Sequence, residues 1–194
     1  ALLRYNAIKT YTQYDVVSAT ETSGDNIADY SVFAGNVLKV TKDGASYIDE
    51  KGVTKWDVSY AMKMPHAEVC GNYAIVADMN GKDVYVFNVD GEVSRQTLTY
   101  DISNVDIAEQ GVYTLVLVGE DCNYINGYDK DSNTIYELKT TIDKSGYPMD
   151  IDISNDGQKL VTSYMKIQGT KVQSVIAMYN FSSVGQNENA DRMM

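Results

Sequence analysis

The sequence predicts an all-β fold built from repeated four-stranded units, and three observations support this prediction. Apolar residues alternate with polar ones in β-branched and aromatic runs, of which 73–79, 83–89 and 112–118 are the clearest. No window of helical length carries a convincing amphipathic stripe. Glycines, asparagines and aspartates recur in step between the runs, as they do where tight hairpins join antiparallel strands.

Two markers recur along the chain and define the repeat. A glycine that opens one hairpin recurs at intervals of 36, 40 and 46 residues, at Gly35, Gly71, Gly111 and Gly157. An apolar residue followed by Asp or Asn precedes a second hairpin at intervals of 39, 41 and 51 residues, at Ile48-Asp49, Phe87-Asn88, Tyr128-Asp129 and Tyr179-Asn180. Repeats of roughly 40–50 residues that hold about four strands are typical of β-propeller blades.

The repeat predicts β-propeller-type blades of four antiparallel strands, about four of them, in a partial ring. The blades are predicted at about 28–60, 66–100, 104–142 and 148–194, with inner strands at 29–33, 67–70, 105–109 and 149–154. Residues 1–24 form an N-terminal segment that we expect to complete a terminal blade or to cover a sheet edge. A blade buries its faces only against its neighbours. We therefore expect either further chain or a second copy, in a homodimer of four plus four blades, to complete the ring.

Residues 129–137, DKDSNTIYE, resemble the start of a calcium loop, because Asp129, Asp131 and Asn133 fall at alternate positions. The full loop pattern fails, since its sixth position is Thr134 rather than glycine and its twelfth is Thr140 rather than glutamate. The segment also occupies the hairpin slot that the other repeats fill without alternate carboxylates. The sequence therefore predicts a turn here, and we expect no metal site and no cofactor.

Composition limits the classes of partner. The chain has 194 residues and a net charge of −11, which disfavours nucleic acid and anionic lipid as partners. No apolar run approaches the ~20 residues that a membrane-spanning helix needs. The chain begins at Ala1 without a leader, so we expect any signal or anchor to have been removed or left out. Cys70 and Cys122 lie 52 residues apart and are predicted at opposite ends of their blades, which predicts no disulfide between them.

Catalytic motifs are absent from the sequence, which contains no nucleophile elbow, phosphate-binding loop, zinc-protease motif or dinucleotide fingerprint. The single histidine, His66, has no paired nucleophile motif and is predicted to be structural. Asp106, Asp150 and Asp152 fall on predicted inner strands, which line the channel of a propeller, so they are the candidate ligand-binding or catalytic residues. A solvated channel wall is the simpler explanation for them. Trp56 is predicted to wedge between neighbouring blades.

Several segments resemble known propeller families. Residues 46–56 resemble a segment of quinoprotein-type blades, and residues 152–161 resemble the Ser-x-Asp-Gly turn of WD-repeat-type and translocation-type propellers. Four segments resemble a bacterial family of unknown function whose members are membrane-anchored, extracytoplasmic and propeller-like: 37–60, 71–93, 145–164 and 179–187. This resemblance implies an extracytoplasmic location, an N-terminal transmembrane anchor outside this chain and further blades beyond Met194. It implies no catalytic residues.

Two hypotheses about function follow. The first is a non-catalytic extracytoplasmic binding or scaffold domain at the bacterial cell surface, with a protein, glycan or cell-wall component as its ligand. The second is a hydrolase or lyase that acts on polysaccharide or peptide through acidic residues of the channel. A sensor coupled through the anchor is a third option. The absence of any catalytic motif favours the first hypothesis.

Overall fold

The computed structural model describes residues 13, 15–16, 19 and 27–182. The described residues form fifteen β-strands and no helix, arranged as four antiparallel sheets. In chain order the strands are β1 (Asp29–Phe33), β2 (Asn36–Thr41), β3 (Gly44–Ile48), β4 (Thr54–Ser59), β5 (Pro65–Cys70), β6 (Tyr73–Asp78), β7 (Asp83–Asn88), β8 (Gly91–Thr97), β9 (Asp101–Ile107), β10 (Tyr113–Val118), β11 (Asn123–Tyr128), β12 (Thr134–Thr140), β13 (Tyr147–Ile153), β14 (Lys159–Gln168) and β15 (Lys171–Asn180).

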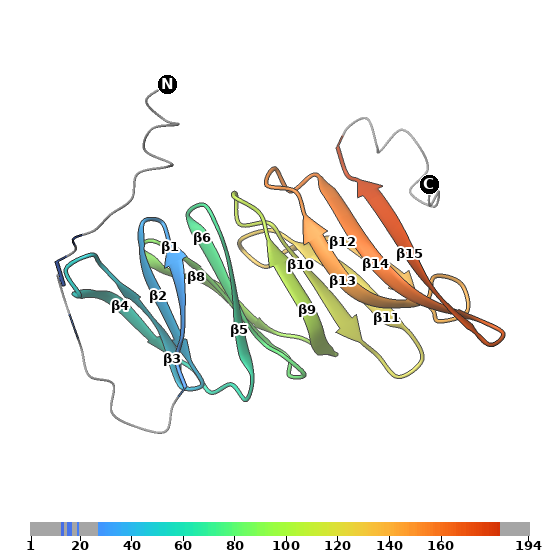
Figure 1. Cartoon of the computed structure of the whole chain (residues 1–194), viewed down its shortest axis with the longest axis horizontal. Helices are drawn as coiled ribbons and strands as arrows, with labels where there is room; N and C mark the ends of the chain where they lie inside the picture. Colours follow the sequence, from blue (N-terminus) through green and yellow to red (C-terminus); the bar gives the residue numbers. More distant parts are fainter. Residues whose placement is uncertain (1–12, 14, 17–18, 20–26, 183–194) are drawn as a thin grey trace.

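Each sheet is a meander of consecutive strands, and the four sheets stand side by side in chain order (Figure 1). Sheets 1 to 3 have four strands each, and sheet 4 has β13, β14 and β15 among the described residues. This arrangement confirms the all-β prediction of blade-like units. The outer strand predicted for the fourth blade lies outside the described residues, as does the segment 1–24 apart from four isolated residues. The first strands β1, β5, β9 and β13 contact one another in succession.

The glycines that open the inner hairpins adopt the conformation predicted for them. Gly35 and Gly111 have φ angles of 80° and 82°, and Gly71 and Gly157 also lie in the left-handed region. An L-residue with a Cβ rarely adopts this region, whereas glycine enters it without steric cost. The turn before the second strand of every blade is therefore encoded locally.

The Asp or Asn of the second marker caps the turn that follows the third strand of each blade. Oδ1 of Asp49 accepts hydrogen bonds from the backbone N–H groups of Lys51 and Val53, both at 2.9 Å. Asn88, Asp129 and Asn180 accept equivalent bonds from N–H groups two to four residues further on. Short polar side chains form such turns because they replace a backbone carbonyl as the acceptor. DKDSNTIYE is thus one of four equivalent turns.

Three apolar clusters lie between successive sheets and hold the blades together. One joins blades 1 and 2, a second joins blades 2 and 3, and a third joins blades 3 and 4. Trp56 on β4 stacks between Tyr47 and Phe87, with ring centroids 5.6 and 5.1 Å away, and donates a hydrogen bond to the Val89 carbonyl at 3.2 Å. It therefore wedges between blades 1 and 2, as predicted.

Strand β9 begins earlier than predicted, at Asp101 rather than near residue 105. The cause is a tertiary contact, because the backbone N–H of Ile102 donates to the Gly81 carbonyl and the N–H of Asn80 donates to the Ile102 carbonyl, both at 2.8 Å. Ile102 is fully buried between the blades. Within the described part of the chain, no helix is long and apolar enough to cross a membrane.

Candidate binding site

Strands β9 and β13 bring the predicted acidic residues close together, and two of the three fasten one blade to the next. Oδ2 of Asp106 on β9 accepts the backbone N–H of Ile153 on β13 at 2.6 Å, and its Oδ1 accepts the N–H of Ile107 at 2.8 Å. Oδ1 of Asp150 on β13 accepts a hydrogen bond from Nδ2 of Asn104 on β9 at 2.9 Å. Both carboxylates therefore act as hydrogen-bond acceptors across the junction of blades 3 and 4.

Asp106 is the electrostatically perturbed member of this group. Partial burial raises the pKa of its carboxyl, and the nearby carboxylates of Asp152 and Glu68 raise it further, against the lowering effect of its two N–H donors. Asp152 itself is exposed. A carboxyl with a raised pKa beside a second carboxylate is the arrangement that many hydrolases use for proton transfer. In this chain each oxygen of Asp106 accepts a hydrogen bond from a backbone N–H group, of Ile107 and of Ile153, so the carboxyl also has a structural role.

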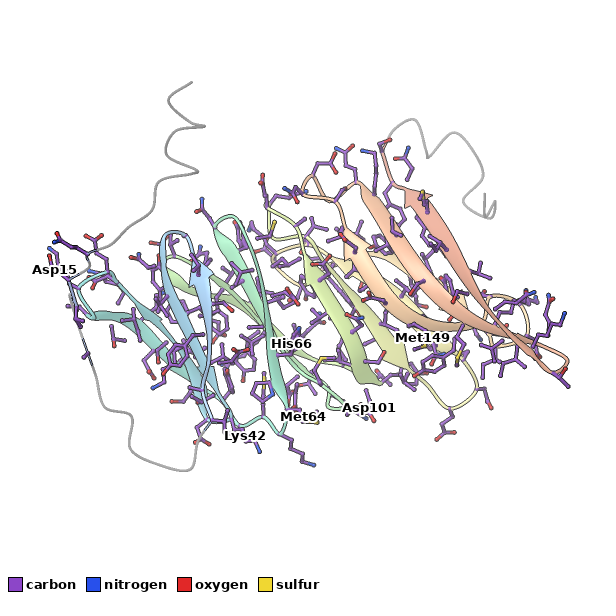
Figure 2. All side chains as sticks on the ribbon, in the orientation of Figure 1. Asp15, Lys42, Met64, His66, Asp101 and Met149 are labelled. Carbon is purple, nitrogen blue, oxygen red and sulfur yellow. The ribbon has the colours of Figure 1, made fainter. Side chains whose placement is uncertain are left out.

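His66 lies exposed on β5, and its Nε2 is 2.9 Å from Oε1 of Glu68 on the same strand (Figure 2). Lys42 and Met64 lie near the start of this strand, where they border a hollow of about 410 Å³ between blades 1 and 2. The other residues that border it are Ile27, Asp29, Val40, Lys63, Pro65, His66 and Met79. Apolar side chains border this hollow together with Lys42 and Lys63. The candidate site residues Asp106, Asp150 and Asp152 do not border it.

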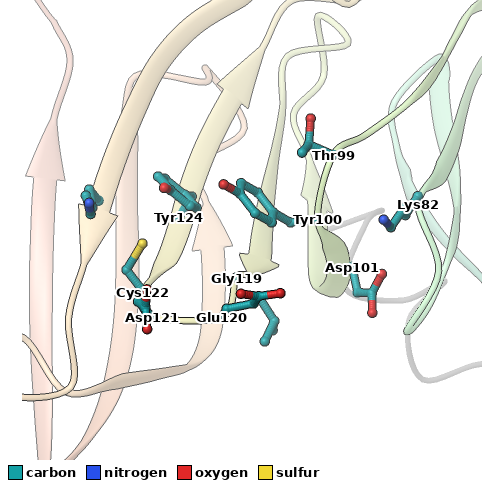
Figure 3. Close-up of a pocket in the computed structure, with 11 residues that line it drawn as sticks. Lys82, Thr99, Tyr100, Asp101, Gly119, Glu120, Asp121, Cys122 and Tyr124 are labelled. Atoms are coloured by element: carbon teal, nitrogen blue, oxygen red, sulfur yellow. The ribbon is translucent and has the colours of Figure 1, made fainter.

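A larger polar notch lies beside the β10–β11 hairpin of blade 3 (Figure 3). It has a volume of about 580 Å³ and is lined by Lys82, Thr99, Tyr100, Asp101, Val118, Gly119, Glu120, Asp121, Cys122, Tyr124 and Lys139. Lys82 comes from the β6–β7 hairpin of blade 2, whereas the remainder come from the approach to β9 and from blade 3. We call this site the rim notch.

Two tyrosines form one wall of the rim notch. The rings of Tyr100 and Tyr124 stack with centroids 5.0 Å apart and planes 13° apart, and Cys122 lies next to Tyr124 (Figure 3). Hydrogen bonding of the Tyr124 hydroxyl with the Cys122 thiol, and then with Tyr100, raises the pKa of Tyr124 well above its ordinary value. Tyr124 therefore keeps its proton well into the alkaline range.

The charges around the notch are mixed, which suits a polar ligand with both donors and acceptors. Asp101, Glu120 and Asp121 supply three carboxylates, and Lys82 and Lys139 supply two ammonium groups. Hydrogen-bonding groups around an aromatic surface allow a ligand to stack and to be oriented at once. Within the described ranges, no group of three or more His, Cys, Asp or Glu side chains is arranged to hold a metal ion.

The turn that forms the floor of the notch depends on Gly119. Its N–H donates to the Cys122 carbonyl at 3.0 Å, and a Cβ at this position would lie 2.6 Å from that carbonyl oxygen. The sequence identified this hairpin but not the site, because its lining comes from four segments that only the fold brings together. The one available signal was the excess of tyrosine, 16 residues against 3 phenylalanines.

The two cysteines lie in different blades, Cys70 in blade 2 and Cys122 in blade 3, and both are free thiols in the structure. Cys70 ends β5, where burial raises the pKa of its thiol and the Glu109 and Asp106 carboxylates raise it further. Cys122 lies in the hairpin that borders the rim notch. The Cys122 thiol therefore lies beside Tyr124 at the rim notch.

Meandering antiparallel sheets of three or four described strands, packed face to face, define the class of this protein as β-propeller-like, and solved structures with the same architecture agree. A WD40 domain of Pan2 from Neurospora crassa matches with a TM-score of 0.50 and 11% identity, over 81% of this chain and 49% of that one. BamB from Moraxella catarrhalis matches with a TM-score of 0.52 and 11% identity, over 82% and 49%. Hydrazine synthase from Kuenenia stuttgartiensis matches with a TM-score of 0.58 and 14% identity, over 87% and 50%.

The chain belongs to a family of unknown function, DUF5711, whose model matches residues 7–194. A comparison with curated proteins found no match. The chain spans about half the length of the solved structures named above. Their low identity establishes the shared fold alone.

Proposed function

We propose that this chain is a non-catalytic binding or scaffold domain that acts outside the cytoplasm, at the bacterial cell surface. The observation that carries the proposal is the rim notch, where the Tyr100–Tyr124 pair stands among carboxylates and ammonium groups. The ligand that this chemistry suits is a saccharide or saccharide–peptide of the cell wall, which offers hydroxyl, amide and charged groups together. The extracytoplasmic location rests on the sequence resemblance described above.

The rigid attachment of blade to blade supports a binding role. The carboxylates of Asp106 and Asp150 accept hydrogen bonds between β9 and β13, which joins blade 3 to blade 4. The notch lies away from them, on the β10–β11 hairpin. A stable scaffold that presents a preformed polar site is the usual arrangement of a recognition domain.

A thermal-shift screen against muropeptides and common glycans tests this proposal. A ligand at 100 times its Kd adds about 2.7 kcal/mol to the free energy of unfolding, which raises Tm by several degrees. We expect Tyr124→Ala to abolish the shift, and Val53→Ala, which truncates an exposed side chain on blade 1, to preserve it. A ligand-induced shift that survives Tyr124→Ala unchanged would place the binding site elsewhere.

The alternative is a hydrolase or lyase that uses the acidic residues of the inner strands. It is favoured by the raised pKa of Asp106 next to Asp152 and Glu68, since such a carboxyl could donate a proton to a leaving group. The Asp150→Ala, Asp152→Ala double variant distinguishes the two proposals. Under the binding proposal, the double variant retains ligand affinity, and neither it nor the wild type releases product from the ligand.

A further inference from the structure

The hollow between blades 1 and 2 is a second candidate site, separate from the rim notch. Its volume of about 410 Å³ lies in the range of small-molecule sites in proteins. Its border combines residues around the start of β1, the end of β2, the start of β5 and the residue that follows β6. None of the residues that line it also lines the rim notch.

The wall of the hollow that carries Lys63 and Met64 is fixed to both blades. Asp78 lies at the end of β6 and is 7% exposed, and its Oδ1 accepts the backbone N–H groups of Lys63 and Met64 at 3.0 and 2.7 Å. Directly before them, Met62 donates its N–H to the Lys42 carbonyl at 2.9 Å. These bonds hold the two lysine-bearing segments together, so the hollow is preformed and a ligand need not order it.

Positive charge exceeds negative charge on the border of the hollow. Lys42 and Lys63 supply two ammonium groups, whereas Asp29 supplies the one carboxylate among the residues that border it. Neither lysine forms an ion pair within the part of the chain that the structure describes. The rim notch has the opposite balance, with three carboxylates and two ammonium groups. In a chain with a net charge of −11, this local excess of ammonium groups favours an anion at the hollow.

Apolar side chains form most of the remaining border, and part of their surface is in contact with water. Ile27 is 92% exposed and Met64 is 55% exposed, and Val40, Pro65 and Met79 lie beside them. A ligand that covers apolar surface gains free energy from its removal from water, and a methionine side chain adapts its shape to the ligand. Figure 2 shows Lys42 and Met64 close to each other near the start of β5. The hollow therefore places unpaired ammonium groups next to apolar surface.

We propose that this hollow binds a small organic acid in which one carboxylate is attached to an apolar chain. The carboxylate accepts charge-assisted hydrogen bonds from the ammonium groups of Lys42 and Lys63. The apolar chain lies against Met64 and Ile27, whose exposed surface it covers. The proposal does not depend on the ligand proposed for the rim notch, because the two sites share no residue and have opposite charge balances.

An amide NMR titration of the intact chain with sodium octanoate tests the proposal. We expect saturable shift changes at residues 40–42, 63–64 and 79, and little change at residues 118–124 of the rim notch. Octylamine carries the same length of chain on a cationic group, and acetate lacks the chain, so neither should shift the residues of the hollow. No saturable binding up to about 10 mM octanoate, or equal binding of octylamine, would overturn the proposal.

Substitutions identify the groups that hold the ligand. Lys42→Gln and Lys63→Gln each remove one ammonium group at an exposed position, and each should weaken octanoate binding about tenfold. Met64→Gln replaces apolar surface with an amide and should also weaken binding. The control Lys51→Gln, at an exposed position in the turn after β3, changes the net charge equally and should leave the Kd unchanged.

Far-UV circular dichroism verifies that each variant is folded. An octanoate Kd that the Lys42→Gln, Lys63→Gln double variant retains contradicts the assignment of the hollow. Weakening of the same size in Lys51→Gln also contradicts it, since the effect would then follow net charge rather than the site.

Discussion

Aspartate side chains have two structural roles in this chain: some cap hairpin turns, and Asp106 accepts a hydrogen bond from the next blade. Asp49 and Asp129 cap hairpins, and their carboxylates accept N–H groups that the turn leaves without another partner. Asp106 accepts one N–H from its own strand and one from the next blade. The sequence shows an aspartate at position 106, but it does not show which N–H group of the neighbouring blade that carboxylate accepts. In the structure this group is the N–H of Ile153.

Asp106→Ala should destabilise the protein by about 1–3 kcal/mol, because the Ile153 N–H loses its acceptor at a partly buried junction. Asp152→Ala, at an exposed position on β13, should change the free energy of unfolding little. Urea unfolding measures both variants. If Asp106→Ala were as stable as the wild type, Asp106 would not be a fastener, and the enzymatic alternative would gain support.

The Asp49 carboxyl should titrate far below an ordinary aspartate. Its hydrogen bond with Lys55, followed by the Val53 N–H, lowers the pKa of the carboxyl to about 2. A folded-state pKa below the unfolded one means that Asp49 stabilises the fold above about pH 4, and that this contribution is lost as pH falls towards 2. Carbon-detected NMR titration of Asp49 measures the pKa, and Lys55→Ala should raise it. A midpoint near 3.8 in the wild type would refute the Lys55 interaction.

At the scale of elements, the sequence predicted most of the hairpins and little of the packing between blades. The four glycine turns and the four Asp or Asn caps could be located because each depends on a few neighbouring residues. The start of β9 was wrong by about four residues, because contacts of Ile102 with the β6–β7 hairpin extend the strand. Local propensity carries no information about such contacts.

Gly127 on β11 shows how one small residue permits an inter-blade contact. A Cβ at this position would collide with the ring of Tyr136, which lies over the strand, hydrogen-bonds to Thr114 at 2.6 Å and stacks on Phe181 with centroids 4.0 Å apart. Gly127→Ala should therefore destabilise the protein by about 1–3 kcal/mol through overpacking.

A double-mutant cycle with Tyr136→Ala tests this explanation. Once the ring is gone, Gly127→Ala should cost little, so the two effects should fall well short of additivity. Urea unfolding of the wild type, both single variants and the double variant measures the coupling. Additive effects would mean that the Tyr136 ring is not the reason for glycine at this position.

At the scale of the whole molecule, the repeat predicted the number and order of the blades but not where a ligand binds. The predicted candidates Asp106, Asp150 and Asp152 do lie close together, yet two of them hold blades 3 and 4 together. The rim notch combines residues 82, 99–101, 118–124 and 139, and no sequence motif connects these segments. The rim notch could not be predicted from the sequence, because only tertiary packing brings Lys82 of blade 2 to the β10–β11 hairpin.

The most direct test of the account is an amide NMR titration of the intact chain with a ligand that raises Tm, recorded while the ligand's own resonances are followed. We predict that the largest shift changes fall at residues 82, 99–101, 118–124 and 139, and that the ligand remains unchanged. Shift changes centred on residues 66–68, 104–106 and 150–152, together with the appearance of product resonances, would contradict the account and identify the inner strands as an active site.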